Sequence, residues 1–221
     1  MYKTETHLHT SEVSPCAHLT AAEMVVRYHA AGYKTIIITD HFQNPYFERL
    51  GDMPWQEKVE RFLQGYDNAV EAAKEYGMHV ILSAEIRFNG SPNHYLLLGI
   101  DRDFLKQRPD VLDMEIETFY PYAKRHGVTV IQAHPYRDGS CYPTWESVDG
   151  VEAYNTNPRH ENYMQQTLEQ ARQKRKAVTS GSDAHRAEDI AIGGVLSQKE
   201  IRTAEDYVQL LMAGLLEPMG E

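Results

Sequence analysis

Several histidines and carboxylates stand where predicted β-strands end, and together they could bind metal ions. Five such segments occur: His7-Leu8-His9, Thr39-Asp40-His41, Ala84-Glu85, Ala133-His134-Pro135 and Ser182-Asp183-Ala184-His185. Imidazole and carboxylate groups are ligands that zinc, iron and manganese accept. If so many ionisable groups converged inside a fold without counter-cations, each charge would cost several kcal/mol. The segments therefore predict a metal centre.

The spacing within these segments supports shared ligation. His7 and His9 are two residues apart on a predicted strand, so both side chains leave the same face. Asp183 and His185 repeat this spacing near the other end of the chain. A single segment of this kind is more often a surface pair, a turn or a strand exit, but five strand ends of one polarity favour a catalytic metal site. The predicted catalytic set is His7, His9, Glu85, His134, Asp183 and His185.

The elements that must position these groups alternate between strand and helix patterns. Strands are predicted at Tyr2–Leu8, Thr35–Thr39, Val80–Ser83, Tyr95–Ile100, Val128–Gln132, Val151–Tyr154 and Ala177–Ser180. Helices are predicted after the Thr20/Glu23 capping box, from Val59 to a stop at Gly77, over Met114–His126, from Asn157-Pro158, and after Thr203. This alternation indicates an α/β fold with a largely parallel sheet. A (β/α) barrel fits and an open doubly wound sheet stays possible; both place active sites at the carboxyl ends of strands.

Composition limits the classes of function. The 221 residues suffice for one domain spanning residues 1–221, and 42% hydrophobic with 24% charged residues is ordinary for a folded protein. The net charge of −10 opposes capture of extended nucleic acid, although a small anionic substrate is compatible with bound cations. No glycine-rich nucleotide loop, apolar membrane span or basic-then-apolar leader is present. We therefore expect a cytoplasmic protein without a membrane partner.

The ordered segments resemble the motifs of the polymerase and histidinol phosphatase (PHP) family. HLHT, TDH, an isolated glutamate after a strand, AHP and a late SDAH follow one another from residue 7 to residue 185. The resemblance implies a distorted seven-stranded (β/α) barrel, two or three divalent ions (zinc, manganese or iron) and phosphoesterase chemistry. It assigns His7, His9, Glu85 and Asp183 to a first ion, Glu85 and His134 to a second, and His41 and His185 to a third.

Three positions fit the family pattern less directly. His94 is the candidate for a further ligand, although it begins a predicted strand rather than ending one. The family often supplies another ligand shortly after the first motif, where this chain reads SEVSPCAH, so Cys16 or His18 could take that place. Asp40 is expected to orient His41 or a neighbour rather than to bind an ion.

The implied reaction is hydrolysis of a small phosphomonoester, with a metal-bridging hydroxide as the nucleophile. The candidates for binding the phosphorylated substrate are Arg137, Arg186, Arg159 and Asn155. Three alternatives stay open: a phosphodiesterase or exonuclease acting on nucleotide or nucleic-acid ends, a hydrolase of C–N or C–O bonds, and a non-catalytic interaction module stabilised by metal. The C–N hydrolase is less favoured because no lysine suited to carboxylation replaces Glu85.

Overall fold

The strands form two mixed sheets in the computed structural model, which describes residues 1–220. The first sheet has the order β11 (Glu217–Pro218), β10 (Val195–Ser197), β1 (Tyr2–Leu8), β2 (Tyr33–Ile38) and β4 (His79–Leu82). The second has the order β3 (His41–Phe42), β5 (Glu85–Ile86), β6 (His94–Leu98), β7 (Thr129–Ala133), β8 (Gly150–Asn155) and β9 (Ala177–Gly181). All seven predicted strands are present, with ends shifted by a few residues at most.

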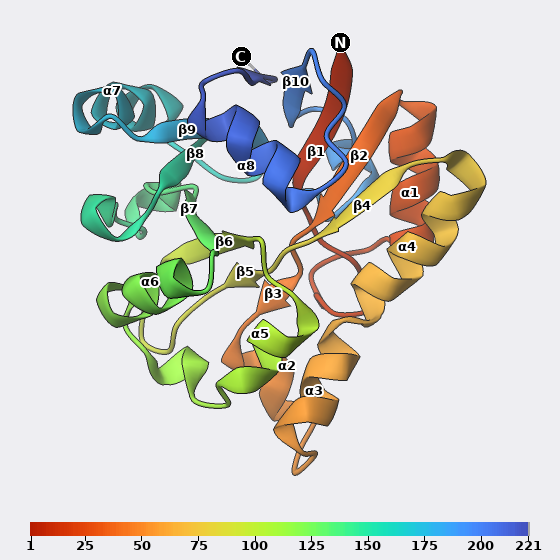
Figure 1. Cartoon of the computed structure of the whole chain (residues 1–221), viewed down its shortest axis with the longest axis vertical. Helices are drawn as coiled ribbons and strands as arrows, with labels where there is room; N and C mark the ends of the chain where they lie inside the picture. Colours follow the sequence, from red (N-terminus) through yellow and green to blue (C-terminus); the bar gives the residue numbers. More distant parts are fainter. Residues whose placement is uncertain (221) are drawn as a thin grey trace.

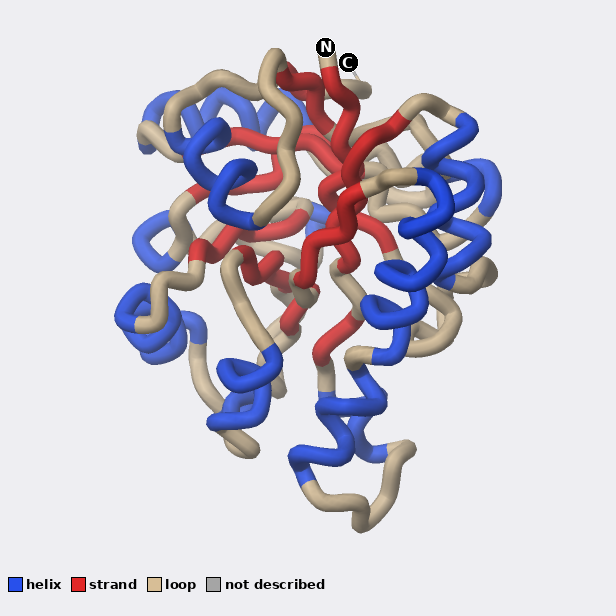
Figure 2. The backbone as a smooth tube through the Cα atoms, turned by 45° about the vertical axis from the view of Figure 1, so that its right-hand side comes forward, coloured by secondary structure: helices blue, strands red, loops and turns tan. Residues whose placement is uncertain are grey.

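The helices lie outside the strands, which occupy the middle of the molecule (Figures 1 and 2). They are α1 (Ala21–Ala30), α2 (Asn44–Glu48), α3 (Trp55–Phe62), α4 (Gln64–Tyr76), α5 (Arg102–Gln107), α6 (Ile116–Arg125), α7 (Met164–Lys174) and α8 (Ala204–Met212). The predicted capping box begins α1, where the Thr20 hydroxyl accepts from the Glu23 amide. None of the helices in residues 1–220 is long and apolar enough to cross a membrane.

The two sheets are joined where β2 continues into β3 and β4 continues into β5. Hydrogen bonds run across this join, from the Ser83 amide to the Ile38 carbonyl and from the Glu85 amide to the Asp40 carbonyl, both at 3.0 Å. Parallel pairing then carries on between His41 and Glu85. The join therefore places the ends of the second and third predicted strands, with their ligand candidates, directly beside each other.

The predicted seven-stranded barrel is not closed by hydrogen bonds. Among the described residues, β1 and the segment after β9 meet through a single parallel bridge between Leu8 and Ala184 rather than a continuous ladder. The amino-terminal half of β1 pairs instead with β10, where Tyr2 lies opposite Ser197. Because β10 pairs at that edge and β11 pairs with β10, the strands form two mixed sheets, and the predicted seven-stranded barrel is not confirmed.

Strand direction also departs from the prediction of a largely parallel sheet. Five strand pairs are parallel, but β6 runs antiparallel to both of its neighbours, β5 and β7, and β10 runs antiparallel to β1. A turn at Asn89 and Gly90 returns the chain into β6 without a crossover helix. The amino end of β6 therefore lies at the same edge as the carboxyl ends of β5 and β7.

Two helix predictions were wrong in their bounds. The helix expected through Val59 to Gly77 divides at Leu63, because α3 packs its apolar residues in the cluster around Phe42 whereas α4 packs against α1. The helix expected from Asn157 begins only at Met164. Its predicted start is a loop, in which the Asn157 side chain donates to the Asp183 carbonyl oxygen at 3.1 Å.

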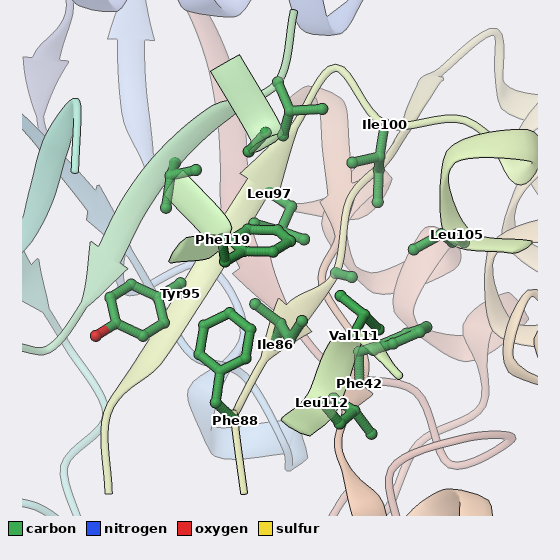
Figure 3. Packing of buried hydrophobic residues seen from close by; sticks show 14 of the residues in the cluster. Phe42, Ile86, Phe88, Tyr95, Leu97, Ile100, Leu105, Val111, Leu112 and Phe119 are labelled. Atoms are coloured by element: carbon green, nitrogen blue, oxygen red, sulfur yellow. The ribbon is translucent and has the colours of Figure 1, made fainter. Parts of the chain in front are cut away.

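The largest hydrophobic cluster supports the second sheet on the side of α3, α5 and α6. Figure 3 shows Phe88, Tyr95, Leu97 and Phe119 packed together within it. The rings of Phe88 and Phe119 lie 5.1 Å apart, and Phe119 and Tyr95 are fully buried. This packing fixes β5 and β6 and so holds the residues at their ends in place.

Candidate metal centre

Glu85 lies at the centre of the predicted ligands. Its side chain is buried and follows β4 at the join of the two sheets. Its Oε1 lies 3.1 Å from His134 Nε2, 3.0 Å from His94 Nδ1 and 3.4 Å from His7 Nε2. Its Oε2 lies 2.6 Å from His41 Nδ1 and 3.7 Å from His9 Nε2. One carboxylate thus faces five imidazoles, which is the arrangement expected of a group that bridges ions.

Asp183 forms the other acidic side of this cluster. Its Oδ1 lies 3.1 Å from His9 Nε2, and 3.4 Å from both His7 Nε2 and His185 Nδ1. Because the Leu8–Ala184 bridge fixes the end of β1 against the segment after β9, the first and last motifs meet as the sequence predicted. Asp183 therefore shares the histidine pair with Glu85.

Potential ligand atoms approach one another closely enough to share ions. Three groups have all their ligand atoms within 4.8 Å of one another: His7, His9 and Glu85; His41, Glu85 and His94; and His9, His41 and His185. The contacts of Glu85 and Asp183 add His134 to the same cluster. The structure thus brings together all eight residues predicted as metal ligands.

The place of His94 in this cluster follows from strand direction. His94 opens β6 and lies opposite Ala133, the residue before His134. Because β6 runs antiparallel, its first residue reaches the edge where the neighbouring strands end. The sequence indicated the residue but not the reason for its position.

Two candidate ligands have backbone conformations that are unusual for their residue types. His134 has a φ of 31° and Asp183 a φ of 48°. L-residues other than glycine rarely adopt positive φ, and such strain concentrates at functional sites. His134 directly follows β7 and Asp183 is the second residue after β9, so in both places the backbone turns at a strand end and the side chain enters the cluster.

The imidazoles around Glu85 stabilise its charged form. Burial alone would raise its pKa, but His94, His7 and His41 outweigh burial and hold the pKa of Glu85 well below its usual range. For Asp183, Arg137 and His7 likewise overcome burial and hold the pKa of this carboxyl well below its usual range. The surroundings therefore favour the charged form of both carboxylates, which is the form that binds cations.

The pKa values of the cluster histidines are shifted in different directions. Burial lowers the pKa of His7, but Glu152, Asp183 and Glu85 raise it well above its usual value. His41 responds in the same way, since Glu85 overcomes burial and raises its pKa to about 10. Burial, together with the charges of His41 and His185, instead holds the pKa of His9 well below its usual value. In the metal-free protein the surroundings thus favour the neutral form of His9 and the protonated forms of His7 and His41.

The buried polar atoms test whether ions fit this site. Within residues 1–220, Glu85 Oε2 and His134 Nδ1 are buried without a hydrogen-bond partner. His41 Nδ1 is close to Glu85 Oε2, but the approach lacks hydrogen-bond geometry. Buried polar groups are otherwise almost always satisfied, and a mixed nitrogen and oxygen set suits zinc, iron or manganese. The residues fit divalent ions.

A buried carboxylate that the sequence analysis missed supports His7. Glu152 accepts a hydrogen bond from His7 Nδ1 at 2.8 Å, which leaves Nε2 directed toward Glu85 and Asp183. Asn155 Nδ2 donates to the other oxygen of Glu152 at 2.8 Å. A carboxylate behind a histidine ligand fixes its tautomer and ring orientation. The clue in the sequence was an acidic residue inside the otherwise apolar segment of β8.

Asp40 supports the loop after the first motif, as its predicted role requires. Its carboxylate accepts from the Thr10 amide at 2.7 Å and from the Ser14 hydroxyl at 2.8 Å. The Ser14 oxygen lies 3.4 Å from His9 Nδ1. Burial raises the pKa of Asp40 to about 6 despite these hydrogen bonds. Asp40 therefore acts on the neighbour His9 through Ser14.

The four predicted substrate-binding residues occupy different environments. Arg137 donates to Asp183 Oδ2 at 2.6 Å and to Asn155 Oδ1 at 2.8 Å. Arg159 forms two hydrogen bonds with the buried Asp189, at 2.7 and 2.6 Å. The Arg186 side chain is 42% exposed and lies 3.9 Å from Glu188. Arg137 and Asn155 thus adjoin the cluster directly, and Arg159 is engaged elsewhere in the same loop region.

The loop after the first motif carries Cys16, whose thiol is influenced by the imidazoles of His185 and His41. Partial burial raises its pKa, but these imidazoles outweigh burial and lower the pKa of Cys16 to about 6. His18 has an exposed side chain, and its amide donates to the His185 carbonyl at 2.7 Å. Neither of the two alternatives that the sequence offered belongs to the three groups of converging ligand atoms among residues 1–220.

The fold and the histidine–carboxylate cluster define a mixed α/β protein with a candidate metal centre. The family model of the PHP domain matches residues 5–209, and the chain belongs to this family. A comparison with curated proteins gave no match.

Solved structures share the fold at low sequence identity. A two-domain protein from Bacteroides vulgatus ATCC 8482, containing a predicted PHP-like metal-dependent phosphoesterase, has a TM-score of 0.71 at 16% identity, over 98% of this chain and 64% of that one. PsfC from Pseudomonas syringae PB-5123 has a TM-score of 0.67 at 14% identity, over 100% and 91%. An amidohydrolase from Chromobacterium violaceum, with bound sulfate and no metal, has a TM-score of 0.58 at 15% identity, over 85% and 89%. The chain thus spans less than two thirds of the two-domain neighbour.

Proposed function

We propose that this protein is a metal-dependent phosphoesterase that hydrolyses a small phosphomonoester. The observation that carries the proposal is the convergence of five imidazoles on the buried carboxylate of Glu85, one of whose oxygens has no hydrogen-bond partner among the described residues. Membership of the PHP family and the phosphoesterase named in the Bacteroides vulgatus neighbour support the reaction class.

The proposed ligand set distributes the cluster over two or three ions. A first ion would be held by His7, His9, Glu85 and Asp183, and a second by Glu85, His94 and His134; His41 and His185 would hold a third. Divalent ions bound there would activate water and polarise the phosphoryl oxygens. We propose zinc, manganese or iron as the metal because each accepts mixed imidazole and carboxylate ligands.

The residues of the chain itself would orient and neutralise the phosphate. The guanidinium of Arg137 is held at the edge of the cluster by Asp183, and its remaining donors could meet a phosphoryl oxygen. Arg186 is exposed and follows His185 in the chain, so it is the second candidate for contacting the phosphate. Arg159 and Asn155 are engaged by Asp189 and Glu152, so we assign them to holding the loop and the ligands in position.

The negative net charge of the chain favours a small substrate over extended nucleic acid. A chain with a net charge of −10 repels the backbone of extended nucleic acid, because such binding depends on neutralising many phosphates. A single phosphate group needs only the local positive charge of ions and one or two arginines. We therefore propose a small phosphorylated molecule as the partner.

Activity assays on protein loaded with a single known metal test the proposal. We expect protein loaded with zinc, manganese or iron to hydrolyse members of a phosphomonoester panel faster than phosphodiesters and carboxamides. Chelator-treated protein and the Glu85→Gln variant should lose this activity, whereas the surface variant Glu200→Gln should keep it. Failure of the loaded protein to hydrolyse any phosphomonoester would overturn the proposal, and preferential cleavage of diesters or amides would assign the site to another reaction.

A further inference from the structure

Glu5 is a buried carboxylate of β1 that lies outside the groups of candidate metal ligands. Its Oε1 accepts hydrogen bonds from three backbone amides, those of Thr6 at 2.9 Å, His7 at 3.0 Å and Ser182 at 3.0 Å. Its Oε2 accepts from the hydroxyls of Ser182 and Tyr28, the second at 2.8 Å. Five donors therefore surround one side chain that has no contact with solvent.

These hydrogen bonds join the first and the last segments that carry candidate ligands. His7 is the first ligand of one segment, and Ser182 immediately precedes Asp183 in the other. A single carboxylate oxygen accepts from the amides of both segments. Glu5 therefore limits how far the backbones of His7 and Asp183 can move apart.

Asp183 lies between two residues that are both bound to β1. Ser182 is held by Glu5, and the Ala184 amide donates to the His7 carbonyl at 3.2 Å. Asp183 itself has a φ of 48°. Residues other than glycine keep such a conformation only when the surrounding structure enforces it. The bonds on both sides of Asp183 supply this constraint and keep its carboxylate directed at the histidine pair.

The backbone of β1 is irregular at the same place. Its register against β2 shifts between Glu5 and Leu8. Irregularities of this kind redirect side chains beside functional sites. The amides of Thr6 and His7 lie within the shift, and both donate to Glu5. Gly181 leaves room for His7 here, since a side-chain carbon at Gly181 would lie 2.5 Å from His7 Cβ.

We propose that Glu5 is a positioning residue of the metal centre: it holds the backbones of His7 and Ser182 together and so sets Asp183 against the histidine pair. This inference rests on the proposed metal centre but not on the phosphoester reaction. Burying a charge is costly, and a regular ladder between two strands would satisfy backbone amides without one. The carboxylate is explained by the irregular segments that it joins.

Metal binding by chelator-treated full-length protein tests the proposal. Glu5→Gln keeps one oxygen for the three amides, and the two hydroxyls can turn to accept from its new amide group. We therefore expect its zinc affinity and the visible absorption of bound cobalt(II) to stay close to those of the parent. Glu5→Leu removes every acceptor and should bind zinc about 10–100-fold less tightly, the usual range for residues that orient ligands. Its cobalt(II) absorption should also change, because this absorption depends on the arrangement of the ligands.

Two further variants, each lacking a single hydroxyl, separate positioning from packing. Ser182→Ala loses a bond between Glu5 and the segment of Asp183, whereas Tyr28→Phe loses a bond between the same oxygen and α1. We expect Ser182→Ala to weaken zinc binding about tenfold and to alter the cobalt(II) absorption. Tyr28→Phe should leave both unchanged. Denaturant unfolding of the metal-free proteins establishes which variants are folded.

Three results would overturn the proposal: unchanged metal binding in folded Glu5→Leu, Glu5→Gln as impaired as Glu5→Leu, or Ser182→Ala indistinguishable from Tyr28→Phe. Each would show that Glu5 stabilises the fold without positioning the ligands. If Glu5→Leu does not fold, the comparison of Ser182→Ala with Tyr28→Phe decides. A parent protein that binds no zinc would refute the metal centre together with the role of Glu5, whereas metal binding without phosphoester hydrolysis would refute only the proposed reaction.

Discussion

Replacing Glu152 by glutamine tests whether the metal centre depends on a carboxylate that no ion would touch. Glu152 is fully buried and accepts from His7 Nδ1 through one oxygen and from Asn155 Nδ2 through the other, each at 2.8 Å. Glutamine has nearly the same shape but only one accepting end. Asn155 cannot simply turn over, because its Oδ1 already accepts from Arg137 at 2.8 Å. The substitution therefore loses one of the two hydrogen bonds without opening a cavity.

Glu152→Gln should lower both the stability of the protein and its affinity for metal. The unsatisfied donor should lower the free energy of unfolding of the metal-free protein by about 1–3 kcal/mol. Loss of the fixed orientation of His7 should weaken metal binding by about 10–100-fold, since this is the usual effect of removing such a partner. Each tenfold corresponds to about 1.4 kcal/mol in binding free energy.

Calorimetric titration of the chelator-treated variant with zinc measures the affinity, and denaturant unfolding measures the stability. Asp149→Asn is the control: Asp149 is a largely buried carboxylate outside the cluster, and it accepts from Tyr120, Lys124 and the Val130 amide, each at 2.9 Å. The control should lose stability and keep its zinc affinity. If Glu152→Gln remained folded and bound zinc as tightly as the parent, Glu152 would not orient His7 and this account of the cluster would be wrong.

Three further predictions concern the surroundings of the centre. The raised pKa of His41 stabilises the metal-free protein fully below pH 6.5, and this contribution is lost as the pH rises through about 10. The midpoint of thermal unfolding of metal-free protein should therefore fall as the pH rises from 6.5 to about 10, and it should fall less in metal-loaded protein. An equal fall in both forms would contradict this role of His41. Gly65→Ala should destabilise the fold by about 1–3 kcal/mol in denaturant unfolding, because the added carbon would lie 2.2 Å from Thr10 Oγ1; an unchanged midpoint would show that the helix can move away. Arg159→Lys should cost about 1–3 kcal/mol, since lysine cannot form both hydrogen bonds to Asp189, and unaltered stability would mean that the pair contributes little.

The cluster of candidate metal ligands was largely predictable because its residues follow strands. The carboxyl ends of neighbouring parallel strands meet at one edge, so a histidine or carboxylate after each strand brings these groups together whatever the exact closure of the sheet. His7, Glu85 and Asp183 illustrate this: each follows or ends a segment whose β pattern is plain in the sequence.

The features that the sequence did not predict depend on pairing between distant or very short segments. The direction of β6 is set by its pairing with β5 and β7, which leaves no local pattern in the chain. The hydrogen-bonded barrel is not closed because β10, three residues long, pairs with the edge of β1, and the two-residue β11 pairs with β10. Glu152 was missed because a single acid in an apolar segment reveals its partner only when His7 is placed beside it.

A crystal structure of zinc-loaded protein, with anomalous scattering recorded at the zinc edge, tests the central claim most directly. We expect anomalous peaks inside the cluster, with at least one ion bound by His7, His9, Glu85 and Asp183 at about 2.0–2.2 Å from each ligand atom. A zinc-loaded crystal without a peak between Glu85 and Asp183 would contradict the metal centre and the function built on it.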